Sequence, residues 1–165
     1  MDAVHFRWNR ASLRFYIALA ALISALGLPM VLAGEAEARA LGLAWIAALA
    51  WLILALVRRM SDTGPVVSAD AQGLHDRRIA KEGFLWDEIS SIEAYEAENL
   101  TWVGVEFKQP QTSLAKTGWL VRLSAPLHRR FRFPRVSISM ALLDGSTDDL
   151  IAAIRALRPN LVTKA

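Results

Sequence analysis

Two long apolar stretches near the start of the chain restrict what it can fold into. Phe15 to Ala33 is 19 residues without a charge, and Ala40 to Val57 is 18 more. An α-helix needs about 20 mainly apolar residues to cross the hydrocarbon core of a bilayer, so each stretch is long enough to span it. The short polar connection, 34–39, predicts an antiparallel transmembrane hairpin with helices at about 13–33 and 40–58.

The rest of the chain has the composition of a globular domain. The 165 residues are 54% hydrophobic, with a mean hydropathy of +0.29, but the excess is confined to the beginning. The breaker-rich segment Ser61 to Pro65 predicts a linker, so we expect a hairpin at 1–60 and a soluble domain at 61–165. This second part, about 105 residues, suffices for one modest core. The absence of cysteine excludes disulfides and thiol chemistry.

Basic residues predict the orientation of the hairpin. Three arginines lie within residues 7–14, Arg58 and Arg59 follow the second stretch, and the connection holds only Arg39. Lys and Arg are enriched in cytoplasmic segments beside membrane helices. We therefore expect an integral membrane protein with both termini and the C-terminal domain in the cytoplasm.

Two features of the hairpin have alternative interpretations. The segment from Pro29 to Ala33 is similar to the end of a cleavable signal peptide, in which case the second helix alone would anchor the domain. Ala21 and Ala25 on one helix, with Ala44 and Ala48 on the other, have the spacing of closely packed helices, or they reflect an alanine-rich composition. Homo-oligomers through the transmembrane helices are an alternative use of these faces.

Seven short strand-like runs follow the linker, separated mostly by turn-forming residues. They cover residues 66–69, 73–80, 84–86, 89–94, 101–107, 119–123 and 136–140. The last element differs, because Ser146 to Asp149 has the S-x-x-D spacing of a capping box and apolar residues then follow at helical spacing as far as Pro159. Seven antiparallel strands and one amphipathic helix predict a small barrel that the helix closes.

This order of elements resembles the pleckstrin-homology-like (PH-like) domains that many bacteria attach to a two-helix membrane hairpin. The similarity rests on Gly73-Leu74, on the tryptophan-containing segment Phe84 to Ile92, and on Ile138 to Leu142 before the helix. It implies an α+β protein of the bacterial cytoplasmic (inner) membrane. The expected order is an N-terminal two-helix transmembrane hairpin, then a PH-like seven-stranded antiparallel β-barrel or sandwich capped by a C-terminal α-helix. Motifs of this kind mark a fold and imply no catalytic residues.

The sequence offers no recognisable catalytic or metal-binding motif. His5, His75 and His128 lie on different segments without a second ligand at helical spacing, so we expect no metal site and no acid–base catalysis. Signatures of serine nucleophiles, phosphate loops and dinucleotide sites are missing. We expect a protein that is not an enzyme and holds no cofactor. A small membrane enzyme with a site assembled from distant residues is a third hypothesis.

Charges are segregated along the predicted domain. Glu82 to Glu106 holds seven acidic and no basic residues, whereas Lys108 to Arg135 holds seven basic and no acidic residues. Pairing between neighbouring strands is one explanation. Another is a binding surface, because arginines and phenylalanines interleave in the basic block at Arg129, Arg130, Phe131, Arg132, Phe133 and Arg135. Arginine matches phosphate groups, and phenylalanine can enter the headgroup boundary of a membrane.

These observations favour two functions. The first is a non-enzymatic, membrane-tethered interaction or scaffolding module with a protein partner that the sequence does not identify. The alternative is recognition of anionic membrane lipids at the cytoplasmic face through residues 129–135, helped by Arg77 and Arg78; each basic residue near such a surface contributes about 1 kcal/mol. Nucleic acid is not an expected partner, because the segment has only two aromatic residues and no RNP-like motif.

Overall fold

The chain forms two units in the computed structural model, which describes residues 3–97, 100–119, 121–122, 134 and 136–163. The sheet unit combines Met1–Arg7 with Gly64–Ala165, and the helical unit is Trp8–Thr63. This division differs from the expected boundary at residue 60, because residues that precede the first helix form a strand of the sheet unit. The helical unit is thus inserted into the sheet unit along the sequence.

The helical unit contains the two long apolar helices that the uncharged stretches predict. Helix α1 (Arg10–Ala25) continues after a short break into α2 (Leu28–Ala33), and α3 (Ala36–Met60) returns beside them. The candidate spans have 23 and 25 residues with mean hydropathies of 2.2 and 2.5, and only 11% of each apolar window is buried. A core helix of a soluble domain would bury its apolar side chains, so length, composition and exposure all fit helices that could cross a membrane.

A proline causes the break between α1 and α2, and a side chain from α3 bonds the backbone next to it. Pro29 lies in the first turn of α2, and its missing N–H cannot bond the carbonyl four residues earlier. The indole Nε1–H of Trp45 on α3 donates to the Ile23 carbonyl at 3.2 Å. The Ile23 carbonyl also accepts from the Leu26 N–H at 3.1 Å, so the indole is a second donor to a carbonyl in the last turn of α1.

The helices of the hairpin pack through a repeating pattern of small and branched residues. Buried and half-buried positions recur at alternating spacings of four and three on each side, as in a left-handed coiled coil: Leu13, Ile17, Ala20, Ser24, Gly27 and Val31 face Gly42, Ile46, Leu49, Ile53, Leu56 and Met60. The closest approach is at the glycines, since a Cβ on Gly42 would lie 3.0 Å from the Gly27 carbonyl oxygen.

The alanines suggested as a packing face do not form this contact. Ala21, Ala25, Ala44 and Ala48 are all exposed. The spacing they follow places them on the outer surfaces of the hairpin, while Gly27 and Gly42 permit the close approach within it.

One antiparallel sheet contains four short strands from both sides of the helical unit. Its order is β1 (Val4–Phe6), β2 (Val67–Ala69), β3 (Gly73–Asp76) and β4 (Phe84–Leu85). Strand β1 pairs with β2, with Phe6 opposite Val67. The first strand of the sheet and the second are therefore separated in the sequence by the entire hairpin.

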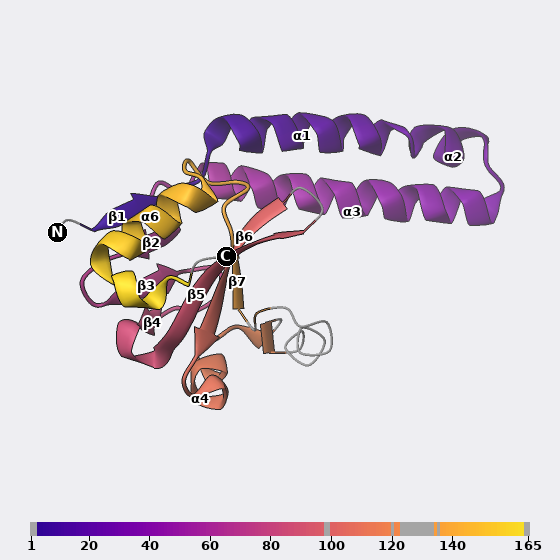
Figure 1. The fold of residues 1–165 in the computed structure, drawn as a ribbon. Helices are drawn as coiled ribbons and strands as arrows, with labels where there is room; N and C mark the ends of the chain where they lie inside the picture. The colour runs from indigo at the N-terminus through magenta and orange to yellow at the C-terminus, as the bar shows by residue number, and fades with distance from the viewer. Residues whose placement is uncertain (1–2, 98–99, 120, 123–133, 135, 164–165) are drawn as a thin grey trace. The chain divides into compact units, whose positions relative to one another are not determined.

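A second antiparallel sheet follows in chain order. It contains β5 (Ile89–Ala97), β6 (Leu100–Phe107) and β7 (Val136–Ser139), with β6 in the centre. The short helices η1 (Trp86–Glu88), α4 (Pro110–Ala115) and η2 (Pro159–Leu161) connect or flank these strands. Figure 1 shows the two sheets as separate groups of strands, with α4 at the end of β6.

The strand expected at residues 119–123 is wrong. Trp119, Val121 and Arg122 are helical, and the N–H of Arg122 donates to the Gly118 carbonyl at 3.2 Å, one helical turn earlier. The alternation of large and polar residues there is short, and a local helical turn satisfies the backbone without a partner strand. In the described part of the chain six strands follow the helices and β1 precedes them.

The core lies where the sheets and the last helix meet. The rings of Phe84 on β4 and Phe107 on β6 are 4.8 Å apart and join the two sheets. Helix α6 (Thr147–Leu157) buries Leu150 and Ile154 and lies against β2 and β6 (Figure 1). The predicted capping box forms: Asp149 N donates to Ser146 Oγ at 3.1 Å, and Ser146 N donates to Asp149 Oδ2 at 2.8 Å.

Candidate functional site

Most residues of the predicted basic and aromatic segment lie outside the described residues. These are Arg129, Arg130, Phe131, Arg132, Phe133 and Arg135. The two remaining candidates, Arg77 and Arg78, lie in the loop between β3 and β4. They are adjacent in the sequence but have different environments.

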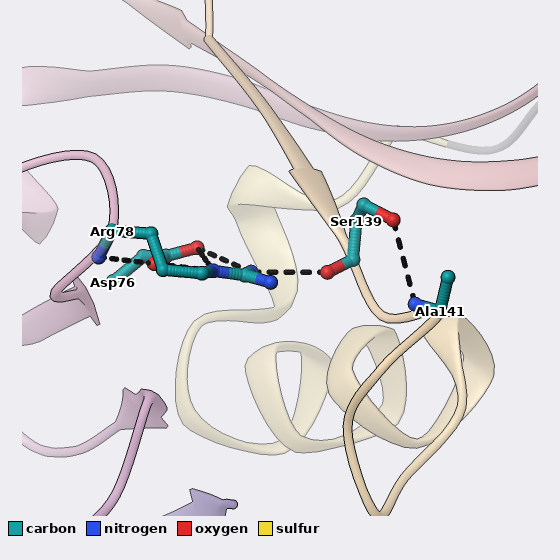
Figure 2. A network of polar contacts seen from close by, with 4 residues as sticks. All are labelled: Asp76, Arg78, Ser139 and Ala141. Atoms are coloured by element: carbon teal, nitrogen blue, oxygen red, sulfur yellow. Dashed lines mark hydrogen bonds and ion pairs between the residues drawn. The ribbon is translucent and has the colours of Figure 1, made fainter. Parts of the chain in front are cut away.

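Arg78 is committed to an internal ion pair (Figure 2). Asp76, at the end of β3, is fully buried. The Arg78 guanidinium meets it with Nε–Oδ1 and Nη2–Oδ2 distances of 2.9 and 2.7 Å, and Nη2 also donates to the Ser139 carbonyl at 3.0 Å. Since Ser139 ends β7, this side chain ties the two sheets together. The planar fork of arginine suits such a bidentate contact.

The loop that contains Arg77 lies beside the points where the chain enters and leaves the sheet unit. Arg77 N–H donates to the Val66 carbonyl at 3.1 Å, and Val66 N–H donates to the Phe6 carbonyl at 2.8 Å. Arg7 is fixed at the same end, because its N–H donates to Asp144 Oδ1 at 2.8 Å and its carbonyl accepts from Asp144 N–H at 3.0 Å. The loop is thus at the sheet end from which both connections to the helical unit start.

An exposed tryptophan adjoins this loop. Gly118 N–H donates to the Ile79 carbonyl at 3.0 Å, and Thr117 forms a β-bridge with Ala80, so Trp119 follows directly after a segment held against the loop. Its side chain is 66% exposed. Together with the exposed basic residues Arg77, Lys81 and Arg122, Trp119 forms what we call the junction surface.

Sequence reasoning missed Trp119 as a surface residue. It was expected at the start of a half-buried strand, where one large side chain in two points inward. A cue was nevertheless present, because Gly118 precedes it and Lys116 and Arg122 flank it, a polar setting for a core tryptophan.

The acidic and basic blocks meet in one ion pair among the described residues. Lys116 Nζ lies against Glu88 Oε1, and both side chains are about a quarter exposed. The pair joins η1 to the end of α4, so it does not lie across two paired strands as charge pairing in the sheet would predict. The ion pair between Lys116 and Glu88 is therefore not a cross-strand pair.

Two cavities near η1 form a second candidate region. They have volumes of about 230 and 240 Å³ and share Asp87 and Lys108. One extends toward α4, past Gln109 and Thr112, and the other toward the α6–η2 connection. We call this combined region the polar groove. Its neighbour Trp86 donates from Nε1 to the Asp70 carbonyl at 2.9 Å, which places the groove beside the turn that follows β2.

Comparison with models of protein families, with curated proteins and with solved structures finds no match to this chain. Inference about function therefore begins from the geometry of the two surfaces. The junction surface offers cations beside an exposed indole ring. The polar groove offers both charge signs around a concave floor.

Proposed function

We propose that this protein is a non-enzymatic, membrane-anchored interaction module. In this proposal α1–α2 and α3 span the bilayer, and the sheet unit binds a protein partner at one membrane face. The observation that supports the anchoring part of this proposal is the pairing of β1 with β2 across the inserted hairpin. A strand before the first helix and a strand after the second can pair only if both helix ends reach the same side.

Short connections limit how far the sheet unit can extend from the ends of the hairpin. Three residues separate β1 from α1, and five separate α3 from Val66. At about 3.3–3.6 Å per residue these connections reach no more than roughly 11 and 18 Å. The arginines near the helix ends, against Arg39 alone in the connection, support the cytoplasmic face of a bacterial inner membrane.

We also propose that the sheet unit is PH-like. Antiparallel sheets of four and three strands followed by α6 support this assignment. The position of β1 before the hairpin is unlike the expected arrangement, in which all strands follow the helices. A fold assignment of this kind supports an architecture for binding and carries no catalytic role.

The polar groove is the surface that we assign to the protein partner. A photocrosslinking amino acid at Gln109, which lines the groove, should capture a discrete partner in intact cells. The matched control is Gln111, which is exposed in the first turn of α4, two residues after Gln109, but does not line the groove. Reversing the charge of Lys108 by Lys108→Glu should abolish the adduct, because this residue lines both cavities.

Equal labelling from Gln109 and Gln111 would count against the groove as the binding surface. An adduct that survives Lys108→Glu would do the same. If no position on the sheet unit gives an adduct with another protein, the proposal of a protein partner fails.

A second candidate function, recognition of anionic lipid headgroups, is supported by the junction surface. Trp119 is 66% exposed, and exposed indole rings beside Arg and Lys are common where proteins meet the headgroup layer. Three basic side chains at this surface would contribute about 1 kcal/mol each on an anionic membrane.

Because the chain has no cysteine, a single label can test this directly. A polarity-sensitive dye on Trp119→Cys should shift its emission to the blue in nanodiscs that contain anionic lipid, and added salt should reverse the shift. The control is the same dye on Gln72→Cys, which is exposed in the β2–β3 turn. Identical spectra in neutral and anionic nanodiscs would exclude lipid recognition by this surface.

A further inference from the structure

The polar groove contains a buried hydroxyl group without a hydrogen-bond partner. Ser113 on α4 is only 2% exposed and lines the cavity that extends toward this helix. Its side-chain oxygen forms no hydrogen bond with any residue that the structure describes. The buried hydroxyls of Thr117 and Thr147, by contrast, donate to backbone carbonyls at 2.8 and 3.0 Å, as buried polar groups normally do. At about 230 Å³, the cavity has room for a polar group that bonds Ser113.

The charges around this first cavity are balanced. Glu88 Oε1 lies against Lys116 Nζ, and Glu88 Oε2 accepts from a backbone N–H at 3.3 Å, so both carboxylate oxygens have partners. Asp87 and Lys108 are exposed, line the same cavity and carry opposite charges. With the buried hydroxyl beside them, this cavity suits a neutral polar group such as a hydroxyl or an amide.

The second cavity has an excess of positive charge. It shares Asp87 and Lys108 with the first cavity and adds Arg158 from the α6–η2 connection. Arg158 is exposed, and its guanidinium forms no ion pair with a described residue. The half-buried side chains of Leu157 and Leu161 line the same cavity. An acidic side chain suits this place, because its carboxylate can bond the two cations while its methylene groups contact the leucines.

We propose that the polar groove binds an extended segment of the protein partner in which an acidic side chain neighbours a neutral polar one. The neutral side chain bonds Ser113 in the first cavity, and the acidic side chain lies at Lys108 and Arg158 in the second. This inference rests on the proposed function, since it names the chemistry of the segment that the groove recognises.

The test uses the full-length protein in neutral phosphatidylcholine nanodiscs and three fluorescein-labelled octapeptides with blocked ends. Each peptide alternates serine with one other residue, which is glutamate, glutamine or lysine. Fluorescence anisotropy should detect binding of the Ser/Glu peptide and at least about tenfold weaker binding of the other two. Arg158→Glu should weaken binding of the Ser/Glu peptide by at least about tenfold. Arg155→Glu is the matched control, because it makes the same change of charge on α6 outside the groove and should have little effect.

Ser113→Ala tests the buried hydroxyl separately. It should weaken binding of the Ser/Glu peptide by about fivefold, the effect of losing one hydrogen bond. Without peptide it should leave the thermal unfolding temperature unchanged or raise it, because no hydrogen bond to a described residue is lost. Thr147→Ala, which removes a buried hydroxyl that has a partner, should lower that temperature.

The inference is overturned if the three peptides bind equally, or if Arg158→Glu and Arg155→Glu have the same effect. It is also overturned if Ser113→Ala leaves the affinity for the Ser/Glu peptide unchanged, which would mean that the hydroxyl bonds only water. A photocrosslinked adduct from Gln109 without binding of the Ser/Glu peptide would overturn this inference and leave the protein partner in place. Absence of any adduct would contradict the proposed function, whichever peptide binds.

Discussion

At the scale of single residues, we expect the ion pair between Asp76 and Arg78 to stabilise the fold. Asp76 is fully buried, and its charge is neutralised by a guanidinium that also bonds the end of β7. Arg78→Ala would leave a buried carboxylate without its partner, which typically costs about 3–5 kcal/mol. We expect a loss near the lower end, because the Arg78 side chain is 26% exposed. Urea unfolding followed by near-ultraviolet circular dichroism measures the difference.

The control for this prediction is Arg155→Ala, an exposed arginine on α6, which should change the free energy of unfolding by no more than about 0.5 kcal/mol. The double variant Asp76→Leu with Arg78→Met should recover most of the lost stability, since a buried pair can be replaced by apolar residues. Equal losses for Arg78→Ala and the double variant would show that the pairing is not the source of the effect.

The lowered pKa of Asp70 predicts a pH dependence of stability. Burial alone raises the pKa of Asp70, but backbone N–H donors from Gln72 and Gly73 and the charges of His75 and His5 lower that pKa below its usual value. The folded protein thus binds a proton on Asp70 less readily than the unfolded chain does. Its stabilising contribution is therefore complete above about pH 5 and is lost as the pH falls through the folded pKa. Asp70→Asn should melt at a lower temperature than the unchanged chain at pH 7, and the difference should shrink below about pH 4. A difference that stays constant down to pH 3 would contradict this assignment.

At the scale of elements, one side chain from α3 adds a hydrogen bond to the last turn of α1, next to the break between α1 and α2. Trp45 donates to the Ile23 carbonyl, so Trp45→Phe keeps the ring but removes the hydrogen bond. In a membrane such bonds contribute about 0.6–2 kcal/mol. We expect a matching loss of stability in thermal unfolding of the protein in nanodiscs.

Trp51→Phe is the matched control, because Trp51 is on the same helix, is 72% exposed and forms no recorded hydrogen bond within the described residues. A larger effect at Trp51 than at Trp45 would mean that the hydrogen bond does not stabilise the break.

Elements defined by their own local pattern could be predicted from the sequence. The long helices follow from uncharged stretches, and α6 follows from its capping box and apolar spacing. Strand β1 could not be predicted from the sequence. Three residues before a helix carry no strand signal, and their partner β2 comes after the hairpin. At residues 119–122 a weak alternation predicted a strand, but a local helical turn satisfied the backbone instead.

Candidate site residues could be predicted less well than elements. The role of Arg78 depends on how deeply Asp76 is buried and on a carbonyl of β7, which are consequences of packing between sheets. The placement of His5 and His75 on either side of Ser68 depends on the register of three strands. Neither is contained in any local spacing, whereas the basic character of the β3–β4 loop is visible in the sequence itself.

At the scale of the whole molecule, the sheet unit should require the residues that precede the hairpin. A fragment of residues 61–165 lacks β1 and the buried ring of Phe6, which packs against Gly145. Loss of a buried phenylalanine costs about 3–5 kcal/mol. We expect this fragment to unfold less cooperatively and at a lower temperature than residues 1–7 joined to 64–165 by a short Gly/Ser linker.

Thermal unfolding of the fragment and of the fused chain tests this prediction. The fused chain with Phe6→Ala serves as an intermediate, since it retains the backbone of β1 and loses only the ring. If the fragment melts as the fused chain does, β1 contributes nothing to the stability of the sheet unit.

Because the hairpin lies between β1 and β2 in the sequence, it also determines the order in which the parts of the chain are synthesised. Strand β1 is synthesised before its partner β2, and about sixty residues are added between them. At 5–20 residues per second this takes roughly 3–12 s. In the proposed membrane-spanning arrangement, the hairpin can enter the bilayer within that interval. The choice of topology thus precedes closure of the first sheet, and the later hydrogen bonds between β1 and β2 make that choice difficult to reverse. A nascent chain that inserted only one helix would leave its first strand across the bilayer from its partner, unable to complete the sheet.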